Sequence, residues 1–145
     1  MKKIQKNKLS ELQHLLSIQE MDVSLIKDIF IRADKFLINN QSISKYDVLQ
    51  GKTICNLFFE NSTRTQTTFE IAAKRLSADV INLDIATSSQ SKGESILDLI
   101  NNLIAMGVSI FVVRHSKPGI PAKIAQNIKN MAHVINAGDG NKEHP

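Results

Sequence analysis

The sequence has a single cysteine, Cys55, which lies inside an apolar run and has no partner for an internal disulfide. A chain of this kind suits a reducing compartment, because structural disulfides form mainly in oxidising ones. No run approaches the roughly eighteen consecutive apolar residues of a membrane-spanning helix. The lysine-rich start is not followed by the apolar segment of a secretory signal. These absences predict a soluble, cytoplasmic protein that does not bind a membrane.

Aromatic residues are also scarce, at 5% of 145 residues. The lysines near the N-terminus are therefore not interleaved with rings on which nucleic-acid bases could stack, and the net charge is only +4. We expect a solvated basic tail and no nucleic-acid partner. The hydrophobic content of 42% and the charged content of 22% are those of an ordinary globular protein, and the length fits one domain with a buried core.

Short apolar runs alternate with stretches of helical periodicity after Gly51. Strands are predicted at residues 54–59, 80–85, 108–113 and 134–137, and the three stretches between them have apolar residues at helical spacing. Gly107 and Pro121 suit a helix end and a helix start. Before this region, Asp22 can cap one helix and Ser10 can begin a shorter one. The pattern predicts an α/β fold in which helices flank a four-stranded parallel sheet buried on both faces, preceded by an N-terminal helix.

Polar and charged residues follow each predicted strand directly. These stretches are residues 60–65, 87–94, 114–115 and 139–144. In a parallel sheet the carboxyl ends of all strands meet at one edge, and ligands bind there at the point where the strand order reverses. The sequence therefore predicts a binding site at this edge.

Ser62, Thr63, Arg64 and Thr65 fall where the first strand ends and a helix begins. The free N–H groups and positive dipole end of a helix favour an anion, and a guanidinium suits phosphate oxygens. A helix cap with a solvated arginine is the alternative. The complete motif of phosphate-loop NTPases is absent, and the glycines near residue 138 do not form the dinucleotide fingerprint.

Other polar residues of this edge have two interpretations each. Arg114 could be a surface charge at a strand end, and Lys92 could lie in a flexible connector. Glu60 could cap the strand end or pair with a basic residue. His115 should point away from Arg114, because adjacent residues of a strand diverge, and we expect it to be structural.

Taken together, these segments resemble the aspartate and ornithine carbamoyltransferase family. Residues 58–65 and 67–70 resemble its carbamoyl-phosphate signature, and three further segments follow in order, at residues 88–95, 105–115 and 136–145. The Lys-Gly-Glu sequence that begins at Lys92 resembles the aspartate enzymes, because ornithine enzymes lack that lysine. The resemblance extends from about Leu15 to Pro145.

The resemblance implies transfer of a carbamoyl group from carbamoyl phosphate to L-aspartate in pyrimidine biosynthesis, with no metal and no organic cofactor. It also implies a role for each matching residue. The phosphate would be held by Ser62, Thr63, Arg64, Thr65 and Arg114, and the carbamoyl oxygen would be contacted by Thr65, Arg114 and His144.

Two further roles come from the same resemblance. Ser88 and Lys92 would lie on a loop that reaches the active site of a neighbouring subunit, so the catalytic unit would be a homotrimer, with a regulatory subunit as a further partner. Glu60 would stabilise the closed form of the two domains of the family enzymes.

The sequence departs from the family pattern in two places. Gln66 stands where a second arginine is usual, which should weaken the local electrostatics without abolishing binding. The family continues beyond Pro145 into a second domain that clamps aspartate, so we expect residues 1–145 to be the carbamoyl-phosphate-binding domain and to be inactive alone. The alternatives are an ornithine-type enzyme and a truncated, non-catalytic remnant that binds only anions or full-length subunits.

Overall fold

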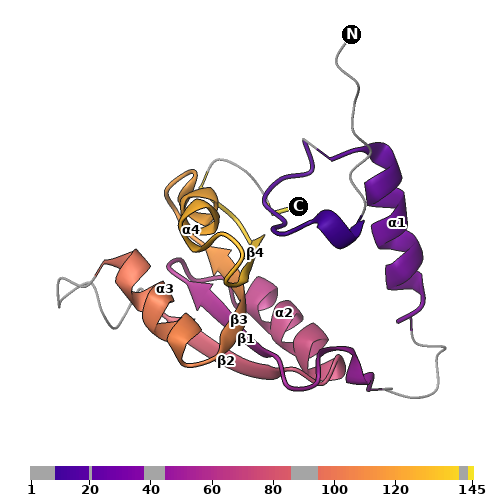
Figure 1. Ribbon diagram of the computed structural model, residues 1–145, viewed down its shortest axis with the longest axis horizontal. Coiled ribbons are helices and arrows are strands. Elements are labelled where there is room, and N and C mark those ends of the chain that lie inside the picture. The colour runs from indigo at the N-terminus through magenta and orange to yellow at the C-terminus, as the bar shows by residue number, and fades with distance from the viewer. Residues whose placement is uncertain (1–8, 20, 38–44, 86–94, 141–143) are drawn as a thin grey trace, which may run out of the picture.

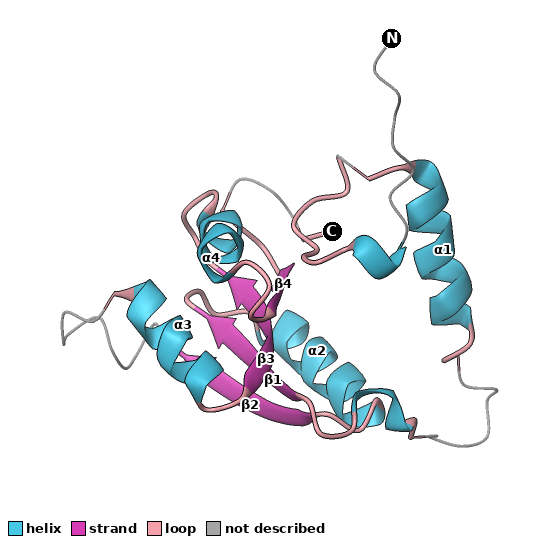
Figure 2. Cartoon of the chain, viewed as in Figure 1, coloured by secondary structure: helices cyan, strands magenta, loops and turns pink. Residues whose placement is uncertain are grey.

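The computed structural model describes residues 9–19, 21–37, 45–85, 95–140 and 144–145. The chain alternates between strands and helices from residue 53 onward (Figures 1 and 2). The strands are β1 (Thr53–Phe58), β2 (Asp79–Asp84), β3 (Val108–Arg114) and β4 (His133–Asn136). The α-helices are α1 (Val23–Asp34), α2 (Thr63–Arg75), α3 (Ile96–Ala105) and α4 (Ile120–Ile128), with short 3-10 helices at Leu9–Glu11 and Asp47–Leu49.

The four strands form one parallel sheet in the order β2-β1-β3-β4. The chain leaves β1 toward one side of the sheet and later returns to add β3 on the other side, so the strand order reverses between β1 and β3. The register places Phe58 opposite Arg114 at the carboxyl ends of these two strands. The predicted α/β fold and the predicted shared edge are both confirmed.

Helices cover the two faces of the sheet unequally (Figure 1). On one face, α3 and α4 pack on the sheet through a core of large apolar side chains, among them Leu57, Ile100, Phe111, Ile124, Ile128 and Val134. Cys55 belongs to this core, and burial raises the pKa of its thiol to about 12. On the other face, α2 packs through a smaller cluster that includes Phe58, Phe69, Ala73 and Val112.

Three local predictions are confirmed. Asp22 caps α1 by accepting a hydrogen bond from the Ser24 N–H at 2.8 Å. Gly107 ends α3 with a φ of 99°, a backbone conformation that favours glycine. Pro121 lies in the first turn of α4, where its missing N–H removes no helical hydrogen bond.

Two predictions need correction. β2 is not buried on both faces, because it is an edge strand of the sheet, and four of its six residues are exposed. The helix expected to begin at Ser10 is only the 3-10 turn Leu9–Glu11, after which the chain runs beside β4 and Leu15 bridges Ile135.

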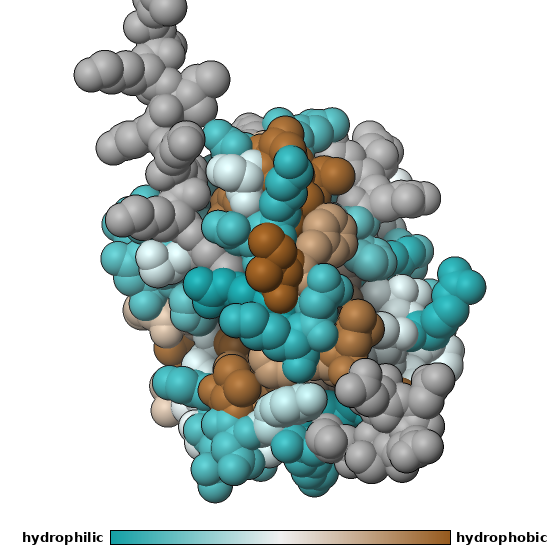
Figure 3. All heavy atoms as spheres, turned by 90° about the vertical axis from the view of Figure 1, so that its right-hand side faces the viewer, coloured by the Kyte–Doolittle hydropathy of each residue, from teal (hydrophilic) through white to brown (hydrophobic). Residues whose placement is uncertain are grey.

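The N-terminal helix α1 leaves apolar side chains exposed. Phe30 and Ile31 are 65% and 59% exposed, and Leu37, just beyond the helix, is 71% exposed. Figure 3 shows hydrophobic side chains among polar ones on the face of the molecule that carries this helix. Within the described ranges, no helix combines the length and the apolar character needed to cross a bilayer.

Candidate functional site

The polar residues singled out by the sequence converge where β1 and β3 end side by side. The Phe59 N–H donates to the Arg114 carbonyl at 2.9 Å, which holds the start of the β1–α2 loop against the end of β3. On the far side of β3, the Ala137 N–H donates to the Val113 carbonyl at 2.7 Å. Three segments distant in sequence therefore meet at the reversal of strand order, where α/β sheets bind ligands.

The first turn of α2 presents its backbone N–H groups without a side-chain cap. Ser62 is the N-cap residue, yet among the described groups its hydroxyl donates to Thr65 Oγ1 at 3.0 Å and accepts from no N–H of the turn. No acidic side chain lies in this turn, and Thr63 and Arg64 are exposed. Free N–H groups and an unneutralised helix dipole make this end of α2 suitable for an anion.

A chain of side-chain hydrogen bonds fixes α2 on the sheet. Ala73 is its only described side chain that is fully buried, so apolar packing contributes little. Asn56 of β1, fully buried, donates to Asn82 Oδ1 at 2.8 Å, and Asn82 of β2 donates to Glu70 Oε2 at 2.8 Å. Because Glu70 lies on the second turn of α2, these hydrogen bonds limit rotation of the helix about its axis. They therefore help to orient the N–H groups of its first turn.

Arg114 is held in place by two acceptors. Its Nη1 donates to the Ala137 carbonyl at 2.9 Å, and its Nη2 pairs with Glu60 Oε1 at 3.1 Å. Arg114 is therefore more than a surface charge, and Glu60 pairs with a basic residue. The Nε–H of Arg114 is buried, and none of the described groups accepts it. A guanidinium that is oriented on two sides and keeps a free donor is prepared for an additional acceptor.

Gly138 makes room for this guanidinium. Its φ is 127°, and a Cβ at this position would lie 2.3 Å from Arg114 Nη1. The conformation is held by a hydrogen bond from the Gly138 N–H to Asn136 Oδ1 at 2.9 Å. Sequence reasoning used this glycine only as part of a motif, and the close approach of a side chain to its backbone was not visible there.

The sequence of this domain matches the family model described as aspartate/ornithine carbamoyltransferase, carbamoyl-P binding domain, over residues 13–145. The chain belongs to this family.

Solved structures of this family resemble the chain in fold. The chain is similar to aspartate transcarbamoylase from Trypanosoma cruzi, solved with carbamoyl phosphate and aspartate, at 27% identity and a TM-score of 0.81, over 97% of this chain and 46% of that one. The catalytic subunit of the M. jannaschii aspartate transcarbamoylase is 35% identical, with a TM-score of 0.79, over 92% and 43%. Ornithine carbamoyltransferase from Thermus thermophilus shares the fold at 23% identity and a TM-score of 0.75, over 88% and 42%. This family member thus spans less than half the length of these relatives.

The structure does not place the remaining motif residues of this carbamoyltransferase domain in contact with Arg114. His144 is exposed, and its ring lies edge-on to Phe69 of α2, with 6.2 Å between centroids, which puts it on the α2 side of the sheet. Gln66 is half-buried on α2, where its N–H donates to the Ser62 carbonyl at 3.0 Å. Ser88 and Lys92 lie outside the described residues. No three His, Cys, Asp or Glu side chains gather as metal ligands within the described part of the chain.

His115 points away from Arg114, as expected. It is buried, its ring packs on Phe59, and its Nδ1 accepts the Lys117 N–H at 2.8 Å. Its contacts are thus on the α3–α4 side, whereas Arg114 contacts Glu60 and Gly138.

Replacement of Gly138 by alanine should release Arg114. Gly107 is the matched control, because it also has a positive φ but a Cβ placed there would meet no other atom within 4 Å. Both substitutions incur backbone strain, and only Gly138→Ala also breaks the bond from Arg114 to Ala137. We expect Gly138→Ala to lower the free energy of unfolding by about 1.5–3 kcal/mol more than Gly107→Ala, measured by urea denaturation. Equal losses would show that the close approach does not hold the guanidinium.

Proposed function

We propose that residues 1–145 form the carbamoyl-phosphate-binding domain of an aspartate carbamoyltransferase. The enzyme would transfer the carbamoyl group of carbamoyl phosphate to the amino group of L-aspartate, forming N-carbamoyl-L-aspartate and phosphate for pyrimidine synthesis. The observation that carries the proposal is the pre-oriented Arg114, with its free buried Nε–H, at the same sheet edge as the uncapped first turn of α2.

The phosphate of the substrate would bind at the N-terminus of α2. Ser62, Thr63 and Thr65 supply hydroxyl and backbone donors, and Arg64 supplies an exposed guanidinium with no ion pair among the described residues. Phosphate gathers negative charge as its bond to the carbamoyl carbon breaks. Fixed donors and the helix dipole would stabilise that charge in the transition state.

The carbamoyl oxygen would be contacted by Thr65, Arg114 and His144. Attack by an amine makes this oxygen negative, and donors that are already oriented stabilise it without reorganisation. Arg114 meets this requirement, since Glu60 and the Ala137 carbonyl hold its guanidinium before substrate arrives. Loss of one such donor typically costs roughly 2.7–4 kcal/mol in the transition state. Holding both reactants together would supply much of the remaining acceleration, with no protein nucleophile.

Aspartate is proposed as the amine on two grounds. The Lys92-Gly93-Glu94 sequence resembles the aspartate enzymes, and the relative at 35% identity is an aspartate transcarbamoylase. Ser88 and Lys92 would act in the site of a neighbouring subunit of a homotrimer, Glu60 would stabilise domain closure, and a second domain would supply the groups that bind the carboxylates of aspartate.

Calorimetry with carbamoyl phosphate and with inorganic phosphate tests the anion site. Arg64→Ala should weaken binding of both ligands about 10- to 150-fold, because it removes charge-assisted hydrogen bonds worth about 1.5–3 kcal/mol. Lys52→Ala removes an exposed cation just before β1, at the opposite edge of the sheet, and should leave the affinity unchanged. Equal affinities for the unmodified chain and Arg64→Ala would reject the site.

A second assay tests the need for a complete aspartate site. We expect the 145-residue chain, given carbamoyl phosphate and either L-aspartate or L-ornithine, to form no carbamoyl amino acid above the uncatalysed background in a colorimetric assay. Its half of the site would bind one substrate without positioning the amine. Turnover with aspartate at the rate of a whole enzyme would contradict the division of the site between domains, and turnover with ornithine would contradict the choice of amine.

A further inference from the structure

The proposed reaction does not use the imidazole of His115. His115 is 6% exposed, and its Nδ1 accepts the Lys117 N–H at 2.8 Å. Burial lowers the pKa of His115, the charge of Lys117 lowers it further, and Glu60 acts in the opposite direction. The ring is therefore neutral at pH 7 and carries its proton on Nε2. None of the described groups accepts a hydrogen bond from this Nε2–H.

The His115 ring lines a pocket of about 480 Å³ on the α3–α4 side of the sheet edge, called here the His115 pocket. The apolar side of its lining comes from four different elements or their ends: Phe59, Ile85, Ile96 and Ile120. Ser116 and Lys117 complete the lining and, with His115, form its polar side. An open hollow of this size that combines apolar walls with a few converging polar groups has room for a small molecule.

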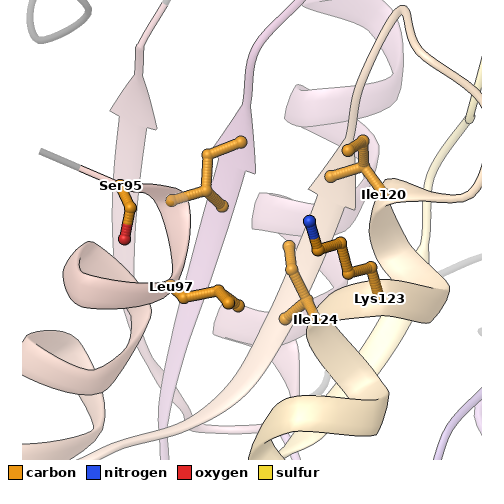
Figure 4. Close-up of a pocket in the computed structure, with 6 residues that line it drawn as sticks. Ser95, Leu97, Ile120, Lys123 and Ile124 are labelled. Atoms are coloured by element: carbon orange, nitrogen blue, oxygen red, sulfur yellow. The ribbon is translucent and has the colours of Figure 1, made fainter. Parts of the chain in front are cut away.

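A second cation lies beside the His115 pocket. A smaller hollow of about 180 Å³ shares Ile96 and Ile120 with it and continues between the first turns of α3 and α4. Figure 4 shows Lys123 extending from α4 with its ammonium nitrogen toward the gap between the helices, above Ile124 and across from Leu97. Two carboxylates lie on neighbouring segments. Asp98 accepts from Ser95, and Asp139 Oδ2 accepts from the Gly119 N–H at 3.3 Å, whereas Asp139 Oδ1 is buried and has no partner among the described groups.

We propose that the His115 pocket binds a small amphiphilic acid, with an apolar, ring-sized body against Phe59, Ile96 and Ile120 and a carboxylate that accepts the Nε2–H of His115. Lys117 and Lys123 favour the negative charge, and the isoleucine and phenylalanine side chains favour an anion with an apolar part over a purely polar anion such as free phosphate. The Nε2–H of the neutral ring can donate to a carboxylate, and the two ammonium groups favour the charge of that carboxylate.

This site is separate from the anion site on α2. Arg114 and His115 are adjacent in sequence but make contacts on opposite sides of the sheet. In the β1–α2 loop, Glu60 pairs with Arg114 on one side, and Phe59 packs on His115 on the other. A ligand that touches Phe59 and His115 therefore contacts the immediate neighbours of the Glu60–Arg114 pair without occupying the phosphate position. The proposal does not depend on the reaction assigned above.

The proposal is tested by titrating the intact chain with 4-phenylbutyrate. Calorimetry measures the affinity, and the methyl signals of Ile96 and Ile120 in NMR spectra report where the ligand binds. We expect saturable binding that shifts these methyl signals and that persists in saturating inorganic phosphate. The neutral analogue 4-phenylbutan-1-ol, with the same ring and chain, should bind at least about tenfold more weakly.

Two variants address the two parts of the pocket. His115→Asn keeps an acceptor for the Lys117 N–H but removes the Nε2 donor, and it should weaken 4-phenylbutyrate about tenfold while barely changing the alcohol. Ile96→Trp fills the apolar part and should abolish binding of both probes. Lys52→Met, at the opposite edge of the sheet, should change neither.

Three results would overturn the proposal. They are methyl shifts confined to other parts of the molecule, equal affinity for the acid and the alcohol, and displacement of 4-phenylbutyrate by inorganic phosphate. Unchanged affinity in both His115→Asn and Ile96→Trp, with melting temperatures close to that of the unmodified chain, would do the same.

Discussion

The guanidinium of Arg114, fixed between Glu60 and the Ala137 carbonyl, is the interaction on which the proposed site depends. It joins the ends of three segments, the loop after β1, the end of β3 and the loop after β4, at the reversal of strand order. The close approach of Arg114 to residue 138 requires a residue without a Cβ, and the positive φ at this position independently favours glycine. Without the oriented Arg114, nothing would distinguish the first turn of α2 as an anion site from the N-terminus of any other helix in the fold.

The two faces of the sheet serve different purposes. The α3–α4 face carries the larger apolar core, with Phe111, Ile124 and Ile128 almost fully buried, and it provides a rigid base for the strand ends. The α2 face is more polar, and the helix is oriented by the Asn56–Asn82–Glu70 hydrogen bonds rather than by large buried side chains. A helix positioned by directional bonds at one rotation suits a site whose donors must converge on a small anion.

Much of the fold could be predicted from the sequence, because strand and helix periods alternate without interruption from Gly51 onward. The exposure of β2 was not predicted, although Asn82 and Asp84 interrupt the apolar residues of 80–85 and both are exposed in the strand. Its place at the edge of the sheet follows only from the strand order. The candidate site was predicted from residues that follow the strands. Its internal geometry was not, because the partners of Arg114 lie 54 and 23 positions away in sequence. The free Nε2 of His115 also depends on a local backbone contact that no periodicity reveals.

The most direct test of the central claim is an NMR titration of the chain with inorganic phosphate that follows the Arg114 Nε–H signal together with the amide signals of residues 63–66. If Arg114 and the first turn of α2 form one anion site, these signals shift together along one saturation curve with a common dissociation constant. Shifts of the α2 amides with no response at Arg114 Nε–H, or two curves with clearly different dissociation constants, would contradict the account.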